Sequence, residues 1–176
     1  MMQHNNGRDY IPKNFYASTK SAFEMILSYY KYANKNLKLY NLKFFESFSE
    51  TDKRKKLIPT LLNNFKKNKT TQIISSNLEL NIVHVDDIIK AIYIVLNNNV
   101  LSGSYCLKNS RNLKIKQLIS NIIQKSQKKL KIRYMTNKIN MPQKSYLKSL
   151  PKWKPDIRIK DKIENQFYNE NNKNQN

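Results

Sequence analysis

Tyr16 and Lys20 are the two residues whose types and spacing in this sequence could do the most specific chemistry. They lie in a run, from about residue 14 to residue 32, whose apolar residues recur at three- and four-residue steps, which predicts an amphipathic helix with one buried face. Residues four apart share one side of a helix, with roughly 5 to 6 Å between their β carbons. An ammonium group there stabilises a phenolate, which suits the phenol to general acid and base catalysis, and it can also donate to ribose hydroxyls.

This spacing alone does not distinguish a catalytic pair from an ordinary helix with a half-exposed tyrosine and a solvated lysine. The chain contains 11 tyrosines and is rich in lysine, so about one or two Tyr-x-x-x-Lys matches are expected by chance. A second match, Tyr134 to Lys138, is present. The segments around each pair therefore have to decide between the two interpretations.

The sequence around Tyr16, Tyr-Ala-Ser-Thr-Lys followed by Phe23 and Glu24, resembles the Y-x-x-x-K helix of the extended short-chain dehydrogenases/reductases. These form the NAD-dependent epimerase/dehydratase family, whose members act on nucleotide sugars. Five further segments resemble family motifs in the expected order: residues 39–45, 54–61, 82–88, 102–105 and 153–155. The resemblance covers roughly residues 3 to 163, and five collinear segments are far more specific than one motif.

The resemblance implies an α/β fold over residues 1–163, in which the late strands and helices of a partial Rossmann-like unit are joined to the small substrate-binding region. Periodicity and turn signals predict the individual elements. We expect helices over residues 56–65, 88–96 and 115–123, and strands over residues 37–45, 72–74, 80–83 and 104–107. Residues 46–53 are expected to form a loop, and residues 164–176, rich in Asn, Gln and Glu, a disordered polar tail.

The resemblance also implies roles for individual residues. Tyr16 would be the general acid/base, and Lys20 would assist it. Both, together with Phe45, would contact an NAD or NADP cofactor. Glu46 and Arg111 are the candidates for binding a nucleotide-sugar substrate.

The sequence departs from the family pattern in two segments near the expected substrate site. Many members carry Arg-Asp just before the strand that leads into the "HVDD" motif, where it holds the substrate's phosphates. This chain has Leu80 and Asn81 there, so that contact is not carried over. The turn after Phe45 lacks the family's Gly and Pro. These departures match reductase-like members better than 4-epimerases.

A glycine-rich turn between a strand and a helix, which a dinucleotide's pyrophosphate needs, is missing from the sequence. The chain has only Gly7 and Gly103, and residues 1–15 contain no Ser or Thr to complete a catalytic triad. We therefore expect the chain to be the C-terminal half of a nucleotide-sugar epimerase, dehydratase or reductase for surface polysaccharide synthesis, lacking the dinucleotide-binding half. It is expected to be inactive and to bind no NAD(P) alone. The alternative is a half-enzyme completed by a separate chain.

Missing strands would have physical consequences for the isolated chain. The strand at residues 37–45 would have a bare edge, so we expect poor solubility or a molten state. Family members commonly pack the tyrosine helix in a dimer interface, so a homodimer is also an expectation.

Composition limits the other classes of function. The net charge of +21 comes almost entirely from lysine spread over every segment, accompanied by abundant asparagine. A basic nucleic-acid-binding module is therefore an alternative, but clustered arginine or interleaved aromatic residues would be more typical of one. The single Cys106 excludes an internal disulfide, and two histidines without a Cys or carboxylate cluster do not form a metal site. Without a long apolar run or a signal-like start, we expect a cytoplasmic protein that avoids membranes.

Asp86 and Asp87 precede an apolar helix. One hypothesis is that they form a catalytic carboxylate pair. An acidic N-cap explains the same pattern, because carboxylates favour the positive end of a helix. We prefer this structural interpretation. Trp153, in a turn-rich segment, is expected to pack as a local anchor.

Overall fold

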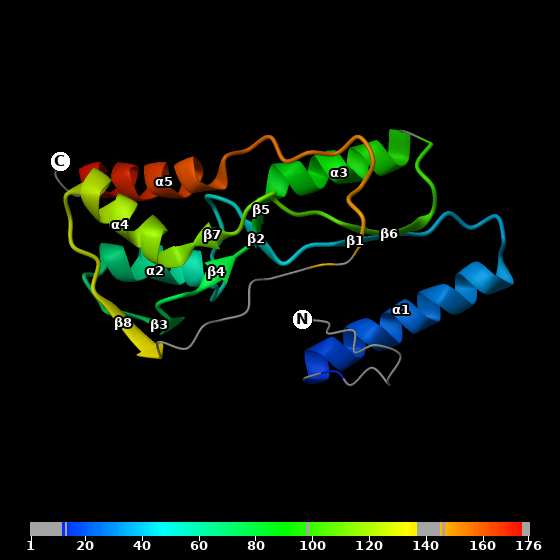
Figure 1. Cartoon of the computed structure of the whole chain (residues 1–176), viewed down its shortest axis with the longest axis horizontal. Helices are drawn as coiled ribbons and strands as arrows, with labels where there is room; N and C mark the ends of the chain where they lie inside the picture. The colour runs from blue at the N-terminus through cyan, green and yellow to red at the C-terminus, as the bar shows by residue number, and fades with distance from the viewer. Residues whose placement is uncertain (1–11, 13, 98, 137–144, 146, 174–176) are drawn as a thin grey trace.

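The computed structural model describes residues 12, 14–97, 99–136, 145 and 147–173 (Figure 1). The helices in this part of the chain are α1 (Phe15–Ala33), α2 (Leu57–Lys66), α3 (Val85–Asn97), α4 (Ile115–Ser126) and α5 (Ile159–Lys173). The strands are β1 (Tyr40–Lys43), β2 (Glu46–Phe48), β3 (Thr71–Ser75), β4 (Glu79–Leu80), β5 (Ile82–His84), β6 (Gly103–Cys106), β7 (Leu113–Lys114) and β8 (Ile132–Thr136).

The strands pair across long sequence separations. β1 pairs with β6, β2 with β5 and β3 with β8, all in parallel, and β4 pairs with β7 in antiparallel orientation. Parallel pairs need crossover connections, and α3 is part of the connection from β1 to β6 (Figure 1). The predicted α/β class is therefore confirmed.

One hydrophobic core lies between α2, α4, α5 and the neighbouring strands. It is built from amphipathic helices whose apolar residues recur at three- and four-residue steps. Its fully buried members include Leu61, Ile73, Leu118, Ile122 and Ile163. The predicted helices at residues 56–65 and 115–123 correspond to α2 and α4, so both predictions are confirmed.

A second core lies under α3 and the β1–β6 pair. Val83, Ala91 and Tyr105 are buried there, and so are Leu150 and Trp153. The Trp153 indole N–H donates to the main-chain oxygen of Asp87 at 2.8 Å, which ties the C-terminal segment to α3. The prediction that Trp153 is a packing anchor is confirmed.

The prediction of disorder from residue 164 onward is wrong for residues 164–173, because α5 continues through Lys173. Ile159, Ile163 and Phe167 follow at four-residue steps and form a narrow apolar stripe, which is buried in the first core. The Phe65 and Phe167 rings meet edge to face with centroids 5.2 Å apart. The average composition of this C-terminal segment is polar and gives no sign of the stripe. Three apolar side chains on one face are nevertheless enough to dock a helix.

The predicted buried face of the first helix is also wrong. Asn14 caps α1, since its Oδ1 accepts the Ala17 N–H at 2.8 Å, and Ala17 is the one buried residue of the helix. Most of the large apolar side chains of α1 remain exposed, from Ile26 at 52% to Tyr32 at 85%, and Leu27 is half-buried. The local sequence sets the helix and its apolar side, but the described part of the chain does not cover that side.

The predicted strand over residues 37–45 is divided. β1 ends at Lys43, a bend follows at Phe44 and Phe45, and β2 begins at Glu46, inside the predicted loop. β2 forms because its backbone pairs in parallel with β5, which lies far away in sequence. Among the described strands β1 has β6 as its neighbour, so one edge of β1 is covered and the expected bare edge is on the other side.

Candidate functional site

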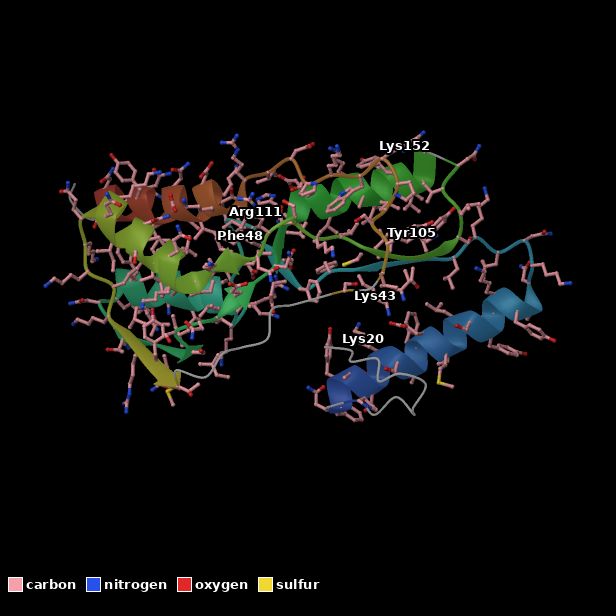
Figure 2. The ribbon with its side chains drawn as sticks, viewed as in Figure 1. Lys20, Lys43, Phe48, Tyr105, Arg111 and Lys152 are labelled. Atoms are coloured by element: carbon pink, nitrogen blue, oxygen red, sulfur yellow. The ribbon has the colours of Figure 1, made fainter. Side chains whose placement is uncertain are left out.

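α1 places Tyr16 and Lys20 on the same side of one helix. The Lys20 Nζ lies 5.5 Å from the centroid of the Tyr16 ring, and Tyr16 is 70% exposed. Figure 2 shows Lys20 on α1 and Lys43 on β1, two neighbouring elements. Glu24 on α1 forms an ion pair with Lys43 at 2.8 Å. This pair links the helix that carries Tyr16 to the strand that leads into the predicted substrate segment.

Tyr134, the tyrosine of the second Tyr-x-x-x-Lys match, lies in a different environment. It lies on strand β8, where residues four apart are not neighbours on a helical side, and Lys138 lies outside the described residues. Burial raises the pKa of Tyr134, which works against a phenolate. Of the two matches, only the one on α1 has the helical geometry that the chemistry requires.

Phe45 and Glu46 lie between β1 and the first core. Phe45 is half-buried in the bend, and Glu46 is the first residue of β2. The Glu46 carboxylate forms an ion pair with Lys56 at 3.0 Å, and its N–H donates to the Asn81 main-chain oxygen at 3.2 Å. Glu46 is thus held by its backbone and by its side chain.

A cavity of about 270 Å³ opens beside Glu46. Glu46, Ser47, Lys56 and Gln72 give it a polar part, and apolar side chains line the rest, namely Leu57, Ile58, Pro59, Ile73, Ile74, Leu78, Leu80 and Ile82. A mainly apolar hollow with a few polar groups is the usual form of a small-molecule site. The walls of the cavity come from β2, α2, β3 and the segment around β4 and β5, so no local sequence pattern predicts it.

Arg54 fixes the polar rim next to this cavity. Its Nη2 donates to Asp52 Oδ2 at 2.6 Å and to Ser47 Oγ at 2.9 Å. The hydrogen bond from Arg54 lowers the pKa of Asp52 and outweighs the effect of its partial burial. Asp52 stays ionised, so the Arg54 guanidinium is already neutralised by a carboxylate.

His84 and Glu50 form a second polar contact close to the cavity wall. His84 is buried, its Nε2 lies 3.0 Å from Glu50 Oε2, and its Nδ1 accepts the Asp86 N–H at 3.2 Å. Because Nδ1 is an acceptor, Nε2 carries the proton and donates to Glu50. Lys162 on α5 reaches the other Glu50 oxygen at 3.1 Å. His84 belongs to the "HVDD" motif, but nothing in the sequence pairs it with Glu50.

Asp87 also has a structural contact, although not the predicted N-cap. It is buried in the first turn of α3, where its carboxylate accepts the N–H groups of Asp156 at 2.9 Å and Ile157 at 3.3 Å. Asp87 therefore holds the segment that leads into α5. Both of its oxygens accept main-chain N–H groups, as is typical of a carboxylate with a structural role.

Arg111 is exposed in the loop between β6 and β7, and Figure 2 labels it there. In the part of the chain that the structure describes, no hydrogen bond or ion pair joins Tyr16 or Lys20 to Glu46 or Arg111. The predicted residues are thus separated. Tyr16 and Lys20 lie on α1, Glu46 lines the cavity, and Phe45 and Arg111 are not among the residues that line it.

The residues present do not fit the pyrophosphate of a dinucleotide. Gly103 lies inside β6, and a Cβ there would meet the Tyr105 ring only at 3.9 Å, so it is not the close-approach glycine of a strand-to-helix turn. Gly7 lies outside the described residues. Within the described ranges, no strand-to-helix turn offers a cradle for such phosphates.

The described residues contain neither a metal site nor a membrane-spanning helix. The described residues contain no group of three or more His, Cys, Asp or Glu side chains arranged to bind a metal ion. None of the helices in those same ranges combines the length and the apolar character needed to cross a bilayer. Cys106 is buried in β6, as expected of a small apolar residue.

Comparisons with known proteins identify the family and the fold. The family model for the NAD dependent epimerase/dehydratase family matches residues 3–106. CDP-abequose synthase from Yersinia pseudotuberculosis is 34% identical over 96 residues, which are 53% of this chain and 33% of that protein. The chain therefore spans about a third of the length of this curated relative.

Solved structures share the fold. The dTDP-glucose 4,6-dehydratase of Bacillus anthracis, solved with NAD, matches 98% of this chain and 57% of its own, with a TM-score of 0.74 and 19% identity. UDP-glucuronic acid 4-epimerase of Bacillus cereus, solved with UDP-glucuronic acid and NAD, matches 97% of this chain and 56% of its own, with a TM-score of 0.75 and 15% identity. The chain has the Rossmann-like fold of these enzymes over a little more than half of their length, and it belongs to the NAD-dependent epimerase/dehydratase family.

Proposed function

We propose that this chain provides the tyrosine–lysine helix and the substrate-binding part of an NAD(P)-dependent nucleotide-sugar epimerase, dehydratase or reductase that serves surface polysaccharide synthesis. The observation that carries the proposal is the presence of Tyr16 and Lys20 on one side of a capped helix within a chain of this family. The relative that makes CDP-abequose supports the reductase branch and a sugar nucleotide as substrate.

In this proposal Tyr16 transfers a proton to or from a sugar oxygen. Its phenol is exposed, so a substrate can reach it, and the ammonium of Lys20 lies 5.5 Å from the centroid of its ring. Lys20 and Phe45 would also contact the cofactor. The proton step is the part of the reaction that this chain's own residues perform, because none of the residues that the structure describes cradle a dinucleotide.

The nucleotide end of the substrate is assigned to the cavity beside Glu46. Apolar walls such as Ile58 and Ile73 suit a planar base, and Glu46, Lys56 and Gln72 offer both donors and acceptors. Arg111 is the proposed contact for the phosphates. A guanidinium binds phosphate oxygens in a two-pronged geometry.

The cofactor site would be completed by an α/β segment outside residues 1–176. Three features support this proposal: the outer edge of β1, the exposed apolar side of α1, and the exposed Ile89, Ile92 and Tyr93 on α3. A parallel strand in a doubly wound sheet needs neighbours on both sides and helices on both faces. Without that segment the chain would not catalyse hydride transfer.

Titration calorimetry on the purified chain tests the proposal. We expect saturable binding of CDP-glucose or another nucleotide-sugar diphosphate, with free glucose inert, because the nucleotide site lies within this chain. NAD and NADP should show no saturable binding. A folded chain, verified by circular dichroism, that binds no nucleotide diphosphate would refute the substrate assignment, and micromolar NAD affinity would refute the assignment of the cofactor site to a second segment.

A further inference from the structure

Asn81 connects the two residues assigned to the substrate. It lies between β4 and β5 and is 2% exposed. Its main-chain oxygen accepts the Glu46 N–H at 3.2 Å, and its neighbours Leu80 and Ile82 line the cavity. The backbone of Asn81 thus belongs to the wall that carries Glu46.

The side chain of Asn81 holds the loop that carries Arg111. Its Oδ1 accepts the Asn109 N–H at 2.8 Å, and its Nδ2 donates to the Asn109 oxygen at 2.9 Å and to Asn112 Oδ1 at 2.9 Å. The Asn109 amide in turn donates to the Ile82 main-chain oxygen. Ser110 and Arg111 therefore lie between two anchored residues.

The hydrogen bonds from the Asn81 side chain to Asn109 and Asn112 form a clamp on this loop, and the clamp is strong because Asn81 is buried. Hydrogen bonds in a low-dielectric interior are stronger than those in water, and a buried amide that loses a partner pays a desolvation penalty. The amide satisfies both the N–H and the oxygen of Asn109, so the loop has little freedom at that point. An exposed side chain on a fixed backbone is pre-organised for a ligand.

Arg111 is also chemically available. Arg54 is neutralised by Asp52, whereas among the described residues Arg111 has no carboxylate partner. Its guanidinium is exposed at the loop between β6 and β7. A positioned guanidinium without a counter-charge favours an anion with two oxygens in one plane, such as a diphosphate.

We propose that Asn81 is a positioning residue that holds Arg111 and Glu46 in one rigid unit, with Arg111 placed for the diphosphate of a nucleotide ligand and Glu46 for its base. The proposal rests on the nucleotide-sugar function above and adds a residue to it. Asn81 touches neither the substrate nor the cofactor, and it acts through the backbone of Glu46 and through the loop of Arg111.

The test is a double-mutant cycle on the whole chain, with CDP as the probe and cytidine as the probe without phosphates. Arg111→Ala should weaken CDP binding by about ten- to a hundredfold, the range for hydrogen bonds to a charged group, and should leave cytidine unchanged. Asn81→Asp keeps the size and one acceptor but loses both donated bonds, so it should weaken CDP to a similar extent. The double variant should be no weaker than Arg111→Ala alone.

Two controls separate positioning from stability and from bulk charge. Arg133→Ala removes an exposed arginine from β8 and should leave CDP affinity unchanged. If Asn81→Asp does not fold, Asn112→Ala removes one of the three clamp bonds and should give a smaller loss for CDP only.

The outcomes distinguish the two proposals. Wild-type chain that binds CDP, together with additive losses in the double variant or an unchanged Arg111→Ala, overturns the role of Asn81 and leaves the nucleotide-sugar function standing. A folded wild-type chain that binds neither CDP nor a nucleotide sugar overturns both. Equal losses for CDP and cytidine in Asn81→Asp indicate a merely structural residue and also overturn the role.

Discussion

Glu50 and His84, 34 residues apart in sequence, share a hydrogen bond of 3.0 Å between a loop carboxylate and a buried imidazole. Lys162 and Gln166 of α5 reach the same loop, the latter by donating to the Glu50 main-chain oxygen at 2.7 Å. The segment after β2 is therefore tied to β5 and to α5. This segment follows directly on Glu46 and Ser47, so the contact also supports one wall of the cavity.

The first prediction concerns acid stability. Burial by itself raises the pKa of Glu50, but the hydrogen bonds from His84, the backbone and Lys162 outweigh it and lower the pKa from 4.5 to about 2. A lowered folded pKa contributes stability that is complete above pH 4.5 and is lost as the pH falls from 4.5 towards 2. Thermal melts across this window should show a steeper loss for the wild type than for Glu50→Gln.

The matched control for that experiment is Glu79→Gln on β4, which lies outside the Glu50 contacts. It should follow the wild-type curve. If Glu50→Gln and the wild type lose stability in parallel below pH 4.5, the ionised contact is not formed in solution.

The second prediction concerns the proton step. In enzyme reconstituted with the segment that completes the cofactor site, Tyr16→Phe should lower kcat by about a hundredfold or more, because it removes the general acid/base. Binding of the nucleotide sugar should not change, since the cavity lies away from α1. Steady-state kinetics and calorimetry on the same preparation check both.

Tyr32→Phe is the control, since Tyr32 lies near the end of the same helix and is 85% exposed. It should retain full activity. Equal losses in the two variants would mean that Tyr16 acts through the helix and not through its hydroxyl group.

The third prediction concerns α5. Phe167 is fully buried against Phe65, so Phe167→Ala should cost about 3 to 5 kcal/mol of the free energy of unfolding. Tyr168→Ala, at the adjacent and exposed position, should cost far less. Urea unfolding measures both, and a neutral Phe167→Ala would mean that the end of α5 is not docked.

The fourth prediction concerns the exposed side of α1. Phe23 and Ile26 are 56% and 52% exposed, so Phe23→Ser with Ile26→Ser should leave the melting temperature nearly unchanged. An apolar surface of this kind promotes association, so the variant should also reduce self-association. Light scattering after size exclusion reports the mass. A large loss of stability would show that these side chains are buried in solution.

The sequence by itself determined the elements that depend on local pattern. The helices α2 and α4 follow from apolar periodicity, since nearest neighbours along a helix are also neighbours in the chain. The Tyr16 and Lys20 pair could be found in the same way. The family followed from the order of short motifs.

Only the tertiary structure decided which distant groups meet. β2 exists because β5 offers it a parallel partner, and α5 is ordered because Phe167 finds a place against Phe65. The cavity beside Glu46 and the clamp of Asn81 on Asn109 join segments whose separation in sequence carries no periodic signal. The apolar pattern of α1 specifies a side that can be buried, but burial requires a covering surface, and a local pattern contains no information about that surface.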